Sequence, residues 1–163
     1  SIDEAMESVF ERNTEEALIV WQHVYIPLNY KYDVGTILPD IIVMIEQLQS
    51  SVSGKFAIDW PSNTFSARWV FDWASDRLLV TATEWRSVVG NTEELLRALP
   101  GIELKKSEYV CEWRALLERA RDALLGAGYS ARTVPEIARL VGVITSIGEY
   151  GTRYRSELRP GHA

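Results

Sequence analysis

An alternation of aromatic residues with mostly polar ones in the stretch FSARWVFDW, residues 65–73, constrains the fold more than any other feature. The rings at alternate positions are those of Phe65, Trp69, Phe71 and Trp73. A repeat of two places them on one face of a β-strand, because successive side chains of a strand point to opposite faces. We therefore expect these rings in the core, and any function of the strand on the face of Arg68 and Asp72. A ligand-binding platform made of the rings is the alternative interpretation.

Two further alternating segments flank this strand and predict that it belongs to a sheet. One covers residues 55–60, and the other runs from Leu78 to about Arg86. Polar turns at residues 61–63 and 74–77 join the three segments, and connections this short make neighbouring strands antiparallel. We thus expect a meander with one apolar face and one mixed face.

Apolar residues at helical spacing predict helices in most of the remaining chain. The first helix opens at Ser1, which forms a capping box with Glu4, and it directs Ile2, Met6, Val9 and Phe10 inward. The other helices are expected at residues 36–50, shortly after Asn91 or Thr92, at residues 107–125 and after Thr133. Everything after about residue 90 is therefore predicted to be helical, except for a polar, loose tail.

The segment after the first helix is open to two interpretations. Residues 17–26 are rich in β-branched and aromatic residues and predict a strand, although Thr14 to Glu16 could equally start a helix. The predicted class is α+β, with an antiparallel β-meander of three to five strands packed against about four to five α-helices. A length of 163 residues suits one globular domain spanning 1–163, with the tail loose from about Arg153.

Charge and cysteine usage limit the possible partners. The net charge is −6, and residues 1–60 hold ten acidic residues against Arg12, Lys31 and Lys55. Such a surface repels phosphate backbones and attracts basic partners, which argues against direct nucleic-acid binding. The single cysteine, Cys111, suits a reducing compartment, and no apolar segment has the length of a membrane helix. We expect a cytoplasmic protein that does not bind membranes.

The chain carries no recognisable catalytic or cofactor motif. His23 and His162 have no partner at a metal-ligand spacing, and Cys111 has no histidine nearby in sequence to make a thiolate nucleophile. Glycine-rich phosphate-binding loops are absent as well. Asp59 and Asp72 could share one face of the meander, but two acids on an open sheet meet only half of what acid–base chemistry requires. The prediction is a protein that is not an enzyme and has no cofactor and no metal.

A resemblance to a known family adds to this interpretation. It is carried by FSARWVFDWASDRLLVTATEWRSVVG at residues 65–90, by CEWRALL at 111–117 and by Gly128-Tyr129. These segments resemble a pattern in bacterial immunity proteins of polymorphic-toxin and contact-dependent growth-inhibition systems. Such proteins neutralise a toxin of sister cells, commonly by covering its active site, and the toxins are often nucleases with basic surfaces. The resemblance implies a cognate toxin C-terminal domain as the partner, and a monomer when free.

An inhibitor of a basic nuclease can occupy its active site by presenting carboxylates. If the resemblance holds, the expected toxin-binding residues are Glu11, Glu15, Glu16, Asp33, Asp59 and Asp72. Two other classes of protein remain open. One is a small enzyme or ligand-binding domain that uses the aromatic sheet as a pocket wall, and the other is a scaffold subunit of a larger assembly.

Overall fold

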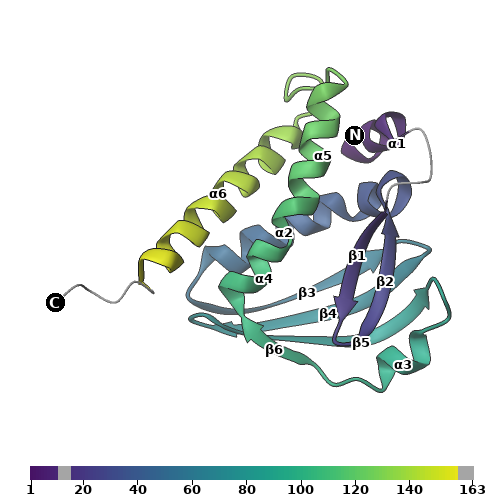
Figure 1. The fold of residues 1–163 in the computed structure, drawn as a ribbon, viewed down its shortest axis with the longest axis vertical. Helices are drawn as coiled ribbons and strands as arrows, with labels where there is room; N and C mark the ends of the chain where they lie inside the picture. The colour runs from purple at the N-terminus through teal and green to yellow at the C-terminus, as the bar shows by residue number, and fades with distance from the viewer. Residues whose placement is uncertain (11–15, 158–163) are drawn as a thin grey trace.

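The computed structural model describes residues 1–10 and 16–157, and their fold belongs to the α+β class, as predicted (Figure 1). The strands form two antiparallel sheets, a two-stranded β1-β2 hairpin and a four-stranded sheet in the order β3-β4-β5-β6. The strands are β1 (Glu16–Trp21), β2 (Val24–Asn29), β3 (Ser53–Pro61), β4 (Phe65–Ala74), β5 (Arg77–Val88) and β6 (Ile102–Lys105). The helices are α1 (Ile2–Val9), the short π-helix η1 (Tyr30–Val34), α2 (Gly35–Ser50), α3 (Glu93–Arg97), α4 (Lys106–Glu112), α5 (Arg114–Gly126) and α6 (Glu136–Glu157).

The predicted meander is present, and its aromatic rings lie in the core. In β4 the odd-numbered side chains from Phe65 to Trp73 are buried, whereas Arg68 and Asp72 are on the outer face. Asp59 lies opposite Arg68 in the register of β3 and β4, so Asp59 and Asp72 share that outer face as expected. Alternate burial along the strand therefore decides which residues stabilise the fold and which reach solvent.

Helices cover one part of the inner sheet face, and the β1-β2 hairpin covers another (Figure 1). Trp113, at the junction of α4 and α5, stacks on Trp60, with ring centroids 6.1 Å apart. From the hairpin, Trp21 packs on Trp69 at 4.9 Å and on Trp85 at 5.6 Å. The hairpin and the helices thus share one aromatic floor, although they come from distant parts of the chain.

The hairpin corrects the prediction of a single strand over residues 17–26. The chain turns at Gln22 and His23, and Gln22 has a φ of 53°, in the left-handed region. Neither residue is a usual hairpin-turn residue, and apolar residues continue on both sides, so the periodicity gave no sign of the turn. Trp21 packs against the sheet and Val24 is buried, so the chain reverses at the two exposed residues between them.

The C-terminal half differs from the prediction in three places. A strand, β6, precedes α4 where only helix was expected, because four residues are too short to show a period. The helix expected at residues 107–125 is interrupted at Trp113, which separates α4 from α5. The tail expected to be loose from about Arg153 is helical as far as Glu157.

Asp33 ties the base of the hairpin to the large sheet. Its carboxylate accepts hydrogen bonds from the backbone N–H of Asn29, at 2.8 Å, and from the hydroxyls of Ser62 and Thr64. The residue is only 5% exposed. A buried carboxylate is tolerated because each of these groups satisfies one of its lone pairs.

We expect Asp33→Ala to lower the free energy of unfolding by about 2–4 kcal/mol, because one buried donor, on Ser62, and two half-buried donors, on Asn29 and Thr64, lose their acceptor. Urea denaturation measures the change. The matched control is Asp72→Ala on the exposed sheet face, which should shift the value by less than about 0.5 kcal/mol. Equal effects of the two substitutions would contradict a structural role for Asp33.

Candidate binding cleft between the hairpin and the α4–α5 helices

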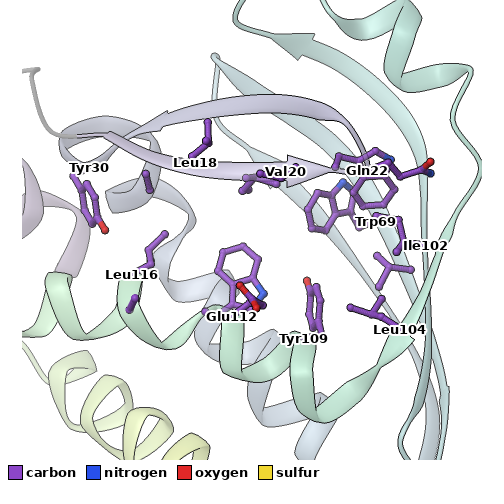
Figure 2. A pocket seen from close by; sticks show the side chains of 16 residues that line it. Leu18, Val20, Gln22, Tyr30, Trp69, Ile102, Leu104, Tyr109, Glu112 and Leu116 are labelled. Carbon is purple, nitrogen blue, oxygen red and sulfur yellow. The ribbon is translucent and has the colours of Figure 1, made fainter.

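A cleft of about 640 Å³ opens between β1 and the α4–α5 helices. Its size falls within the range of roughly 300–1,000 Å³ that is common for ligand sites. Figure 2 shows side chains of β1, β6, α4 and α5 around the space. The lining residues are Ala17, Leu18, Ile19, Val20, Trp21, Gln22, Tyr30, Trp69, Val80, Ile102, Leu104, Tyr109, Glu112, Trp113, Ala115 and Leu116.

The free edge of β1 forms one side of this cleft. Every residue from Ala17 to Trp21 lines it, which a strand achieves by presenting its edge and not only one face. Within the described residues β1 pairs only with β2. The edge of β1 that borders the cleft thus has no paired strand among the described residues.

The register of the hairpin indicates which backbone groups lie at this edge. With a two-residue turn, Trp21 and Val24 form the first hydrogen-bonded pair, so the pairs alternate and Leu18–Pro27 is a non-hydrogen-bonded pair. Proline is suited to that position, since its missing N–H would point away from the partner strand. The N–H and C=O groups of Leu18 and Val20 thus point away from β2.

Aromatic residues make up much of the interior of the cleft. Trp21 and Trp69 are both nearly fully buried, and neither indole N–H has a hydrogen-bond partner among the described residues. Their rings pack edge-on or tilted against other rings, as aromatic pairs prefer. Trp69 therefore belongs both to the core, as predicted, and to the wall of the cleft.

Tyr109 contributes a phenol that is not suited to acid–base catalysis. Its hydroxyl donates to Sδ of Met44 at 3.3 Å. Burial raises the pKa of Tyr109 far above its usual value, because the surroundings do not solvate a phenolate. The group stays protonated at neutral pH and acts as part of an apolar wall.

Two polar side chains border the cleft. Gln22 donates from Nε2 to the carbonyl oxygen of Pro100 at 2.7 Å, which holds the tip of the hairpin against the chain before β6. Glu112, at the end of α4, is exposed and has no ion pair with any other described side chain. The cleft is thus mainly apolar, with one carboxylate available to a ligand.

The outer face of the hairpin is also apolar, although it faces solvent. The side chains of Leu18, Val20 and Tyr25 are 56%, 51% and 63% exposed. Val20 lies directly opposite Tyr25, and Glu16 is on the same face of β1 as Leu18. An exposed cluster of large apolar side chains beside a cleft is typical of an interaction site. We call Glu16, Leu18, Val20 and Tyr25 the hairpin face.

The structure does not gather the six predicted toxin-binding acids on one surface. Glu11 and Glu15 lie outside the described residues. Asp33 is buried and occupied by internal donors, so its carboxylate cannot contact a partner. Glu16 is exposed on the hairpin face. Among the described acids of this prediction, Glu16 is the one on the hairpin face beside the cleft.

Asp59 and Asp72 lie on the outer face of the four-stranded sheet, away from the cleft. Asp59 pairs with Arg68 at 2.5 Å and with Arg86 at 3.6 Å. Arg86 also binds Glu84 at 2.6 Å and, by that hydrogen bond, lowers the pKa of the Glu84 carboxyl. Acids and bases neutralise one another on this face, which reduces its attraction for a basic partner.

Sequence reasoning missed the cleft and the hairpin face. In EALIVW, residues 16–21, apolar side chains occupy both alternating positions, so the pattern does not show which of them is exposed. The cleft is made by β1, β6, α4 and α5, which only the tertiary fold brings together. The one sequence feature that could have indicated an exposed apolar face is the excess of apolar residues in β1.

Among the described side chains, no group of three from His, Cys, Asp or Glu is placed to hold a metal ion. No helix in the described part of the chain has the length and apolar character needed to cross a membrane. Comparisons with protein-family models, curated proteins and solved structures found no match to this chain.

Two leucines of the hairpin test whether the hairpin face is dispensable for folding. Leu28→Ala should lower the free energy of unfolding by about 2–5 kcal/mol, because Leu28 is fully buried. Leu18→Ala should cost less than about 1 kcal/mol, since this side chain already faces solvent. Urea denaturation of both variants measures the difference. A large cost for Leu18→Ala would mean that the face belongs to the fold.

Proposed function

We propose that this chain is an inhibitor that binds another protein, namely an immunity protein that neutralises a cognate bacterial toxin. The observation that carries the proposal is the exposed apolar cluster of Leu18, Val20 and Tyr25 beside an open cleft. Contiguous apolar patches on a protein surface mark interaction sites, and tyrosine is among the residues enriched where most of the binding energy of an interface is concentrated. The hairpin face is therefore the proposed contact surface.

The negative charge of the chain is a second, weaker observation, and it favours a basic partner. The chain has a net charge of −6, and Glu16 and Glu112 are exposed near the cleft. Carboxylates at the rim of an interface accelerate association and select partners more than they add affinity. A nuclease toxin, whose active site is built to hold phosphates, has the matching charge. The acids of the outer sheet face contribute less, since arginines already pair with Asp59.

The resemblance of residues 65–90 to immunity proteins supports the choice of a toxin over other partners. In the structure this segment forms β4, β5 and the aromatic floor on which the hairpin rests. In this proposal the segment acts as the support of the contact surface and does not itself touch the toxin. The expected site of action is the cytoplasm, with a monomer as the free form.

Co-expression in bacteria tests the proposal. The chain is produced together with the C-terminal domain of the toxin encoded beside its gene, and growth should be rescued. The double variant Leu18→Asp/Tyr25→Asp should lose rescue and weaken binding by roughly 100-fold or more, because two apolar anchors become charged. Calorimetry with a catalytically inactive toxin domain measures the affinity.

Asp72→Lys, on the outer face of the large sheet, is the matched control and should keep full rescue. Continued killing by the toxin despite folded, soluble wild-type protein would refute the immunity function. Full rescue by the Leu18→Asp/Tyr25→Asp variant would remove the hairpin face from the interface. Stable self-association of the free chain in sedimentation would favour a scaffold subunit.

A further inference from the structure

We infer that the cleft receives an extended segment of the partner protein, which pairs as a β-strand with the free edge of β1 and places a basic side chain beside Glu112. This inference deepens the proposed function and rests on it, because the segment in the cleft is taken to belong to the protein that the chain binds. It names the mode of recognition, β-strand addition, and the chemistry of the segment.

Backbone groups at the edge of β1 are oriented to pair with another strand. The N–H and C=O groups of Leu18 and Val20 point away from β2, as the pairing of Leu18 with Pro27 requires. The same alternation holds at the base of the hairpin, where Asn29 is a non-hydrogen-bonded position and its N–H bonds Asp33 instead. A strand edge with unused donors and acceptors is a template for another strand.

The hairpin that carries this edge is held in place at both ends. Asp33 holds the base of the hairpin, and Gln22 holds its tip through the carbonyl of Pro100. An edge held at both ends loses little conformational freedom on binding, which favours affinity. Natural edge strands are commonly blocked by lysine or proline. β1, EALIVW, contains neither.

The residues that line the cleft indicate which side chains such a segment would carry. A strand of six residues is about 20 Å long, comparable to β1 itself. Side chains that point inward from such a segment would meet the half-buried Ile102 and Leu104 of β6 and the ring of Tyr109. These contacts favour apolar residues at alternate positions. Glu112 is the one carboxylate among the lining residues, so a lysine or arginine is the complementary residue near α4.

A synthetic peptide tests this inference without any toxin. The probe is a six-residue peptide with blocked ends that alternates valine and threonine and carries one arginine near its centre. Hydrogen exchange by NMR should detect roughly tenfold or greater protection of the Leu18 and Val20 amides on binding. The amides of Ala17 and Ile19, already bonded to β2, are internal controls and should change little. The same peptide N-methylated at alternate residues should not bind, since it cannot complete a strand ladder.

Glu112→Gln separates the charge from the backbone pairing. It should weaken binding of the arginine peptide by about three- to fivefold and leave a peptide with glutamine in place of arginine unaffected. Because Glu112 is exposed and unpaired among the described residues, the variant should fold normally, which urea denaturation checks. If Glu112→Gln weakened the binding of both peptides equally, the proposed contact between Glu112 and a basic side chain would be refuted.

The remaining outcomes are decisive in either direction. Failure of the peptide to bind overturns the inference, as does binding without protection of Leu18 and Val20. An apolar dye that binds in the cleft gives a further outcome. If the peptide displaces this dye without protecting the Leu18 and Val20 amides, the cleft is a small-molecule pocket, and the inference is overturned. If the amides are protected but the toxin still kills, the strand site stands and the immunity function fails. If growth is rescued but the amides of Leu18 and Val20 are not protected in the complex with the toxin domain, the immunity function stands and strand addition fails.

Discussion

The fold depends on Trp69, whose indole lies where the sheet, the hairpin and the neighbouring aromatic residues meet. It is 2% exposed and lies within 4.9 Å of the Trp21 ring and 5.3 Å of the Trp60 ring, centroid to centroid. Burial of such large surfaces supplies most of the driving force for folding a chain of this size. Because Trp21 is part of this contact, the hairpin is held over the sheet by the same core that stabilises the sheet.

That attachment leaves the hairpin with three different environments. One face, with Trp21 and Leu28, is buried; the opposite face, with Leu18 and Tyr25, is in solvent; and the edge of β1 borders the cleft. A globular protein gains nothing in stability from exposed apolar side chains, so their clustering is better explained by binding than by folding. The proposed inhibitor function and the proposed strand site follow from these same environments.

Electrostatics divides the surface in a comparable way. On the outer face of the large sheet, Asp59, Arg68, Glu84 and Arg86 pair with one another, and pairs this exposed contribute little to stability. Around the cleft, Glu112 has no such partner among the described residues. The net charge of the chain favours a basic partner but does not show which surface would contact it. That surface depends on which acids are already paired with arginines.

The sequence by itself determined the α+β class, the buried side of β4 and the apolar faces of α2 and α5, because a period of two or of 3.6 residues needs no knowledge of distant contacts. Only the tertiary structure decided that the chain turns at Gln22, that residues 102–105 form a strand, and that Asp33 is an internal ligand of Ser62 and Thr64. It also made the cleft, whose walls are separated by most of the chain length. Such features arise from packing between segments far apart in sequence, and no local pattern records which segments will meet.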